Sequence, residues 1–173
     1  SDNKEINTQC TGFAYRLTDD MKYLSKEQRA RQIQKLIRHN YKFLGYKQFA
    51  NEVQRLTGWM DGKQKSLTES MKKLIKKEYS NRIVIIDEIH NIKKGGQETR
   101  FVPPYLEAVI KYSKNLRLVM MSATPMYNSP KEFIYILNLL LLNDKRKPIS
   151  ISDVFNTGKT SDGKINKGTL KPE

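Results

Sequence analysis

Two short apolar runs, each ending directly in polar residues, constrain the fold of this chain more than any other feature. The first lies in RIVIIDEIHN at residues 82–91, and the second in RLVMMSATPMYN at residues 117–128. Each apolar run has the length of a buried strand. A loop with Gly95 and Gly96 and a helical pattern around residues 105–112 separate them. The order strand, helix, strand predicts an α/β fold.

The two strands, expected at residues 83–87 and 116–121, are predicted to be parallel neighbours. A helix between two strands of one sheet returns the chain to the same edge through a right-handed crossover. The unbroken apolar character of both runs predicts burial on both faces of the sheet. A further helix is expected where Ser129 and Pro130 supply a start signal.

The chain before the first run is predicted to be mainly helical. SKEQRARQIQKLIRHN begins with a capping-box pattern at Ser25, and SLTE has the same spacing from Ser66. Between these two segments, YKFLGY at residues 41–46 predicts a short strand, and the helix that follows it is expected to end at Gly58.

Charge and composition narrow the class of partner. The 32 Lys and Arg residues against 18 Asp and Glu give a net charge of +14, which attracts nucleic acid or an anionic membrane surface. The apolar run at residues 133–142 is too short to span a bilayer, and no signal-peptide pattern opens the chain, so a soluble protein is expected. The single cysteine, Cys10, excludes an intramolecular disulfide and favours a reducing intracellular compartment.

Asp87 and Glu88 stand at the carboxyl end of the first predicted strand, where open α/β sheets bind their ligands. Mg²⁺ takes oxygen ligands, often through its water shell, and phosphoryl transfer to water needs a group that orients and deprotonates that water. Two adjacent carboxylates can divide these tasks. The alternative is that the pair only caps the following loop.

Ser122, Ala123 and Thr124 follow the second predicted strand in the same way. The separation of 35 positions between Asp87 and Ser122 is about what a loop, a helix and a returning strand require. The two polar motifs are therefore expected to meet at one edge of the sheet.

Together, DEIH at residues 87–90 and SATP at residues 122–125 resemble motifs II and III of superfamily 2 helicases and translocases. Their continuations, DEIHNIKK and SATPMYNSPKEFIYILNLLLLND, are similar to the SWI2/SNF2-like branch. Within this branch, the residues of both motifs most resemble those of the helicase-like ATPases of large nucleocytoplasmic DNA viruses. Examples of these ATPases are the ATPase subunit of the poxvirus early transcription factor and the poxvirus nucleoside triphosphate phosphohydrolase. The resemblance covers roughly residues 10–145 and implies part of a RecA-like (P-loop NTPase) lobe, with helices flanking a parallel β-sheet.

The resemblance also implies a role for each motif position. Asp87 would hold Mg²⁺ through water, and Glu88 would activate the hydrolytic water. His90 would face Ser122–Thr124 and couple the nucleotide state to the grip on nucleic acid. ATP and Mg²⁺ are the implied ligands, and the implied function is a helicase or translocase motor that moves on DNA or RNA, in viral transcription.

The phosphate-binding part of the family pattern is missing. A Walker A loop, G-x-x-x-x-G-K-[ST], cradles the triphosphate with backbone N–H groups and a lysine, but none precedes the acidic motif. NTGKTSDG, with Gly158, Lys159 and Thr160, is interpreted as a chance match in a polar loop, because Asp153 occupies the place of the first glycine.

The second motor lobe is missing as well. Residues 1–145 are therefore expected to be the later part of a first lobe, from after motif I through motifs II and III. Residues 146–173 are expected to be a polar Lys-, Ser- and Gly-rich loop or the start of a following region. Such a fragment is predicted to be inactive by itself. A natural remnant that has lost ATPase activity is the alternative.

Some residues are weaker candidates for nucleic-acid contact. The third predicted helix carries four lysines: Lys72, Lys73, Lys76 and Lys77. They could track a phosphate backbone, although a solvated helix face is the commoner role for such a cluster. Trp59, Tyr41 and Tyr46 could stack on bases, although packing in the core or a loop is the commoner role for such aromatic side chains.

Two functions from different classes remain open. The first is the ATPase core segment of a motor that acts on nucleic acid, with DNA favoured over RNA, in viral or cellular transcription or remodelling. An RNA polymerase or another transcription-factor subunit is a further candidate partner, and no membrane is expected. A viral motor of this kind is expected in the host cytoplasm, the viral factory or the virion. The second is a catalytically inactive basic module, derived from a helicase lobe, that binds nucleic acid or a polymerase.

Overall fold

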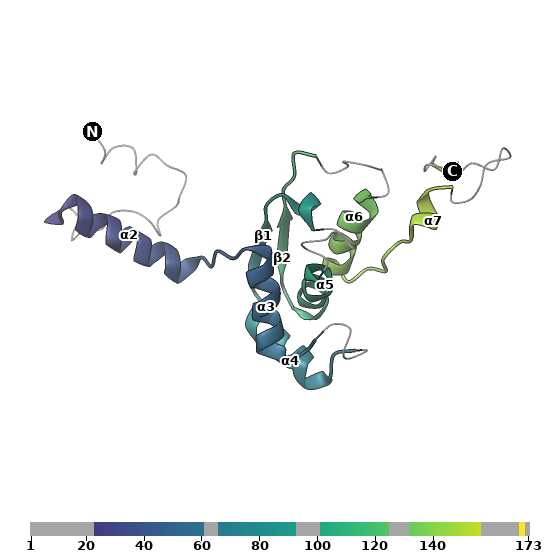
Figure 1. Ribbon diagram of the computed structural model, residues 1–173, viewed down its shortest axis with the longest axis horizontal. Coiled ribbons are helices and arrows are strands. Elements are labelled where there is room, and N and C mark those ends of the chain that lie inside the picture. The colour runs from purple at the N-terminus through teal and green to yellow at the C-terminus, as the bar shows by residue number, and fades with distance from the viewer. Residues whose placement is uncertain (1–22, 61–65, 93–100, 125–131, 157–169, 172–173) are drawn as a thin grey trace. The chain divides into compact units, whose positions relative to one another are not determined.

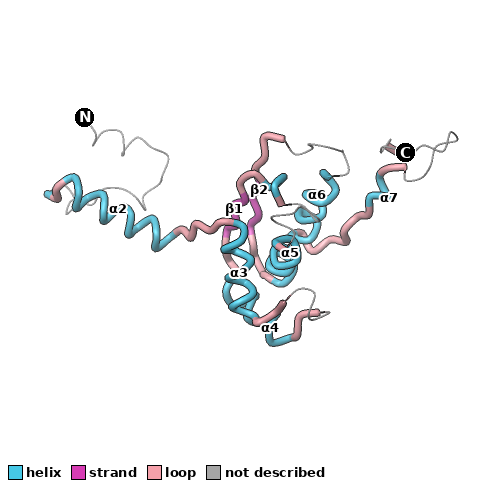
Figure 2. Tube along the Cα trace, in the orientation of Figure 1, coloured by secondary structure: helices cyan, strands magenta, loops and turns pink. Residues whose placement is uncertain are grey.

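The computed structural model describes residues 23–60, 66–92, 101–124, 132–156 and 170–171. The chain divides into two compact units, residues 1–44 and 45–173. The first unit contains helix α2 (Lys26–Asn40). In chain order, the second contains α3 (Tyr46–Thr57), α4 (Glu69–Tyr79), β1 (Ile83–Ile86), the 3₁₀ helix η3 (Ile89–Asn91), α5 (Val102–Tyr112), β2 (Arg117–Met120), α6 (Glu132–Asn143) and α7 (Ile151–Val154) (Figures 1 and 2).

Helix α2 begins with the predicted capping box. The backbone N–H of Gln28 donates to Oγ of Ser25 over 3.2 Å, and the backbone N–H of Ser25 donates to Oε1 of Gln28 over 3.0 Å. The strand expected at residues 41–46 is wrong. Residues 41–45 belong to neither a helix nor a strand, the N–H of Tyr41 donates to the carbonyl of Ile37 over 2.7 Å, and Tyr46 already begins α3. An extended segment becomes a strand only when a neighbour takes up its backbone hydrogen bonds.

Helices α3 and α4 begin the second unit. Helix α3 ends at Gly58, as predicted, in the left-handed conformation with φ of 69°, and the N–H of Gly58 donates to the carbonyl of Gln54 over 2.7 Å. The cap of α4 is not at Ser66 as expected. Thr68 is the cap instead, and its hydroxyl accepts from the N–H of Met71. The helix therefore begins two residues later than the sequence predicted.

Strands β1 and β2 pair in parallel, as predicted, with Ile83 opposite Arg117 and Ile86 opposite Met120. The expected burial on both faces is wrong for the structure as described. Ile83 and Ile85 are 62% and 59% exposed, whereas Ile86 is 7% exposed. Successive strand side chains point to opposite faces, and the described helices pack against only one of them.

Helix α5 lies at the centre of the core and packs against α3, α4 and α6. Its buried side chains include Val102, Leu106, Val109 and Ile110, and prolines occupy its first turn, where a backbone N–H has no helical partner. The order of these elements gives an α/β unit, which agrees with the predicted fold class.

Helix α6 buries Ile134, Ile136 and Leu139. The start signal expected at residues 129–130 lies outside the described residues, and so do residues 157–163 of the Walker-like segment. Within the region after residue 145, the short helix α7 forms behind a capping box between Ser150 and Asp153. None of the helices in the described ranges combines the length and the apolar content needed to cross a bilayer.

Candidate functional site

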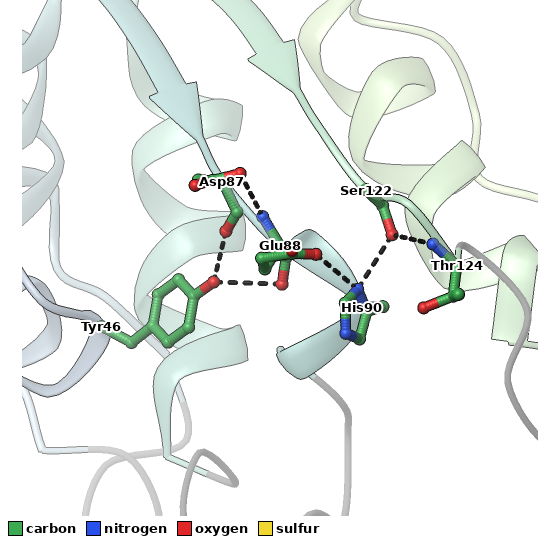
Figure 3. Close-up of polar contacts among 6 residues, drawn as sticks. All are labelled: Tyr46, Asp87, Glu88, His90, Ser122 and Thr124. Atoms are coloured by element: carbon green, nitrogen blue, oxygen red, sulfur yellow. Dashed lines mark hydrogen bonds and ion pairs between the residues drawn. The ribbon is translucent and has the colours of Figure 1, made fainter.

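The ends of the two strands bring the acidic motif and the SATP motif together. The N–H of Met121 donates to the carbonyl of Ile86 over 2.9 Å, and the N–H of Ile89 donates to the carbonyl of Met121 over 3.0 Å. These bonds extend the parallel pairing beyond the last residues of both strands. Residues 87–90 therefore lie beside residues 122–124, as Figure 3 shows.

Glu88 makes a sharp turn directly after β1. Its backbone is in the left-handed region, with φ of 49° and ψ of 48°, which costs a non-glycine residue about 1 kcal/mol or more. The N–H of Glu88 donates to Oδ1 of Asp87 over 3.0 Å, and its carbonyl accepts from the N–H of Asn91 over 2.9 Å. The turn leaves the Asp87 side chain exposed and the Glu88 side chain half-buried.

His90 contacts both motifs through one ring nitrogen. Its Nδ1 lies 2.9 Å from Oγ of Ser122 and 3.1 Å from Oε2 of Glu88 (Figure 3). The same Oγ accepts from the backbone N–H of Thr124 over 3.2 Å. A change at Glu88 can therefore reach the loop after β2 through a single imidazole ring.

Oε2 of Glu88 is shielded from solvent and has no hydrogen bond of good geometry within the described ranges. Its contact with Nδ1 of His90 is therefore electrostatic, and it strengthens when the ring is protonated. A buried carboxylate oxygen that is not fully paired with a donor is suited to accept a proton or to bind water.

Tyr46, at the start of α3, also belongs to this site, although the sequence did not mark it as part of the acidic motif. Its hydroxyl donates to the backbone carbonyls of Asp87 and Glu88, the second over 3.0 Å (Figure 3). Burial raises the pKa of Tyr46; the hydrogen bond with Asn91 opposes this shift, and the charges of Asp87 and Glu88 add to it. The hydroxyl therefore stays protonated at neutral pH and remains a donor.

Asp87 fits a water-mediated contact with Mg²⁺. Its side chain is exposed at the strand end, and only Oδ1 takes a hydrogen bond from the turn. Mg²⁺ keeps most of its water shell and commonly takes one or two carboxylates, so a single aspartate is an adequate protein ligand beside a phosphate group. In the described part of the chain, no three His, Cys, Asp or Glu side chains gather as a metal site.

Gly158, Lys159 and Thr160 of the Walker-like segment lie outside the described residues. Asp153, at the place of the first glycine in that pattern, accepts from the N–H of Ser150 over 2.6 Å. This hydrogen bond is the main cause that lowers the pKa of Asp153. The aspartate therefore caps α7. Its negative charge would repel a phosphate group at this position rather than bind one.

The four lysines of α4 are not equivalent. Lys72 forms an ion pair with Glu69 over 2.6 Å, and its Nζ lies 5.3 Å from the centre of the Tyr112 ring. Lys73, Lys76 and Lys77 are exposed. The last three are therefore better placed than Lys72 to contact a phosphate backbone.

The other aromatic candidates differ in their surroundings. Trp59 is buried, its ring lies 5.1 Å from that of Tyr105, and its carbonyl accepts from the Tyr105 hydroxyl over 3.3 Å. Trp59 is therefore a core residue. Tyr41 is half-exposed and stacks with Phe43, at 6.2 Å between ring centres.

The chain is similar in sequence to viral proteins that are named as helicases or nucleoside triphosphatases, as the two motifs led us to expect. A mimivirus protein provisionally named ATP-dependent RNA helicase R563 (Acanthamoeba polyphaga mimivirus) is 37% identical over 71 residues, which are 40% of this chain and 12% of that protein. Nucleoside triphosphatase I of Heliothis armigera entomopoxvirus is 37% identical over 68 residues, 35% of this chain and 10% of the relative. A protein of Invertebrate iridescent virus 3, provisionally named helicase 087L, is 26% identical over 151 residues, 87% of this chain and 13% of the relative.

The matched regions thus span only 10% to 13% of the length of these viral proteins. No solved structure shows a significant match to the chain. The sequence model of the SNF2-related domain family matches residues 6–163, which are most of the sequence and include both motifs. The chain therefore belongs to the SNF2-related domain family. The meeting of DEIH and SATP at one edge of a parallel sheet agrees with this assignment.

Proposed function

We propose that this chain is part of an ATP-dependent nucleic-acid motor, a helicase or translocase that couples ATP hydrolysis to movement on DNA or RNA. The observation that carries the proposal is the contact of one His90 nitrogen with both Glu88 and Ser122. A motor needs a hydrolytic group that is linked to a second, movable segment, and this ring provides such a link. The family match and the viral relatives support the same class of function.

The two carboxylates divide the hydrolytic work. Asp87 would hold Mg²⁺ through water, and the ion would supply positive charge beside the phosphate groups of ATP. Glu88 is the general base: it orients a water molecule for attack on the terminal phosphorus and takes its proton. The bond from that phosphorus to the bridging oxygen breaks, and ADP leaves with this oxygen. Its half-buried side chain, with one shielded and unbonded oxygen, supports this role within the described part of the site.

His90, Ser122, Ala123 and Thr124 carry the coupling. Release of a proton or a phosphate near Glu88 changes the charge that faces Nδ1 of His90, 3.1 Å away. The ring can then strengthen or release its 2.9 Å contact with Ser122, whose Oγ also holds the N–H of Thr124. The loop after β2 thereby responds to the nucleotide state.

The substrate of the motor is a polyanion. The net charge of +14 favours nucleic acid, and the exposed Lys73, Lys76 and Lys77 of α4 are candidate contacts with its phosphates, with Lys72 in a lesser role because it is paired with Glu69. We favour DNA over RNA and a role in viral transcription, in the host cytoplasm, the viral factory or the virion, with an RNA polymerase or a transcription-factor subunit as partner. The viral origin of the relatives supports this setting.

A second candidate function is a catalytically inactive module that binds nucleic acid or a polymerase. It is favoured by one observation: no Walker A pattern, G-x-x-x-x-G-K-[ST], precedes Asp87 in residues 1–173. In either case, residues 1–173 alone are expected to hydrolyse ATP at a negligible rate, because a base without a phosphate cradle cannot hold its substrate.

A turnover assay on two proteins separates the two functions. Residues 1–173 and the full-length polypeptide are compared with Mg²⁺ and ATP, with and without DNA. The motor predicts hydrolysis by the full-length protein that DNA stimulates, and none by residues 1–173. A full-length protein that binds DNA but shows no turnover contradicts the motor and supports the binding module.

A further inference from the structure

We propose that Tyr46 is a positioning residue for the general base: its hydroxyl fixes the turn that aims Glu88 at the reacting water. The inference deepens the proposed function and rests on it for the role of Glu88. It concerns a residue outside both motifs, on a different helix, 42 positions before the base.

The contacts of Tyr46 converge on one turn. Its hydroxyl donates to the carbonyl of Asp87 and, over 3.0 Å, to the carbonyl of Glu88. These two carbonyls are consecutive in the turn that directly follows β1, so the tyrosine holds the backbone on both sides of the peptide bond between Asp87 and Glu88.

This turn needs an anchor because its backbone is strained. Glu88 is a non-glycine residue with φ of 49°, a conformation that persists only when the surroundings hold it. Oδ1 of Asp87 holds the N–H of Glu88 on one side of the residue, and Tyr46 holds the carbonyl on the other. The direction of the Glu88 side chain follows from the backbone that these two bonds fix.

The anchor is rigid at its own end. Tyr46 is the first residue of α3, its ring packs against the core, and α3 packs against α4 and α5. The hydroxyl is therefore held by the folded body of the unit, whereas the turn itself is short. Replacement by phenylalanine keeps the ring packed against the core and removes only the donor.

Tyr105 provides a matched control. Its hydroxyl also donates to a backbone carbonyl, that of Trp59 over 3.3 Å, and this pair lies in the core rather than in the turn of residues 87–91. Tyr105→Phe therefore removes the same kind of hydrogen bond without touching the turn.

The experiment is a double-mutant cycle in the full-length protein. Tyr46→Phe, Glu88→Gln, the double variant and Tyr105→Phe are compared with the wild type by the single-turnover rate of Mg²⁺-ATP hydrolysis and by the dissociation constant for ATP. Tyr46→Phe is expected to lower the rate about 10-fold or more, because small misplacements of a reacting group are costly, while ATP affinity changes less than about twofold. In the Glu88→Gln background it is expected to cause no further loss, because the group that it positions is already gone.

Three results overturn the inference: a wild-type rate in Tyr46→Phe, the same fold-loss in both backgrounds, or an equal loss in Tyr105→Phe. Amide hydrogen exchange of the same proteins provides a readout that does not depend on hydrolysis. Faster exchange at residues 88–91 in Tyr46→Phe, and not in Tyr105→Phe, is expected, whereas unchanged exchange there contradicts the anchor. A wild type without turnover, or Glu88→Gln at the wild-type rate, refutes the proposed function instead, and the exchange data then decide the anchor by itself.

Discussion

Nδ1 of His90 lies 2.9 Å from Oγ of Ser122, although 32 positions separate the two residues in the chain. The contact exists because β1 and β2 are parallel and in register, so that their carboxyl ends coincide and the residues that follow them meet. It joins a histidine of the acidic motif to the first side-chain hydroxyl after β2.

Glu88→Gln in the full-length protein is expected to leave ATP binding nearly intact and to lower turnover by ~10²- to 10⁴-fold. The amide keeps the shape of the carboxylate but does not accept the proton of the attacking water. Equilibrium binding of ATP and the steady-state rate are the two measurements. Loss of ATP affinity together with turnover would show that residue 88 serves the fold of the turn rather than the chemistry.

His90→Ala is expected to preserve a larger share of basal ATP hydrolysis than Glu88→Gln, and to reduce the stimulation by nucleic acid. The reason is that the ring contacts Ser122 and Glu88 at once and so links two sites rather than acting on the water. Basal and DNA-stimulated rates are measured side by side. His39→Ala, on an exposed position of α2, is the control and should leave both rates unchanged.

Binding of this chain to nucleic acid is expected to be independent of sequence and to weaken steeply with salt, because cations that contact phosphates release condensed counterions. Lys76→Glu with Lys77→Glu should reduce the slope of log K against log [salt] by ~0.7 to 0.9 for each phosphate that the protein no longer neutralises. Titrations at several ionic strengths measure this slope. If Lys147→Glu, an exposed cation outside α4, reduces the slope equally per charge, the effect is one of net charge and α4 is not a specific binding element.

Ile86→Ala is expected to lower the free energy of unfolding of residues 1–173 by about 2–4 kcal/mol, because it leaves a cavity in the core. Ile85→Ala, one position earlier, is expected to cost less than about 1 kcal/mol because its side chain already faces solvent. The exposed fractions of 7% and 59% give the reason for the difference. Urea unfolding followed by circular dichroism compares the pair, and equal losses would mean that both faces of the sheet are covered in solution.

Lys145→Met is expected to destabilise the chain by about 1 kcal/mol. Its Nζ donates to the carbonyls of Ile110, Lys111 and Ser113, over 2.9 to 3.0 Å, and so caps the carboxyl end of α5. Lys147→Met removes the same charge two residues away and should change stability little. Urea midpoints of the two variants test the cap, and similar midpoints would reduce Lys145 to an ordinary surface charge.

The sequence by itself determined the order of the elements from residue 83 onward and the meeting of the two polar motifs, although the strand expected at residues 41–46 does not form. Apolar runs of strand length on either side of a helical pattern leave few alternatives to a parallel pair, and polar residues directly after two such strands must share one edge. The start of α2 at Ser25 and the end of α3 at Gly58 were predictable for a similar reason, because caps depend on side chains and backbone groups within a few positions of one another.

Tertiary structure alone decided which face of the sheet is covered, and how Glu88 is held. Apolar runs in IVII and LVMM show that both faces can be buried, but burial depends on whether another element packs there, and Ile85 is exposed for lack of one among the described residues. The hydrogen bond from Tyr46 to the Glu88 carbonyl joins a helix and a turn 42 positions apart. No local pattern encodes it, because it arises only when α3 has packed on the core and placed one hydroxyl beside a strained turn.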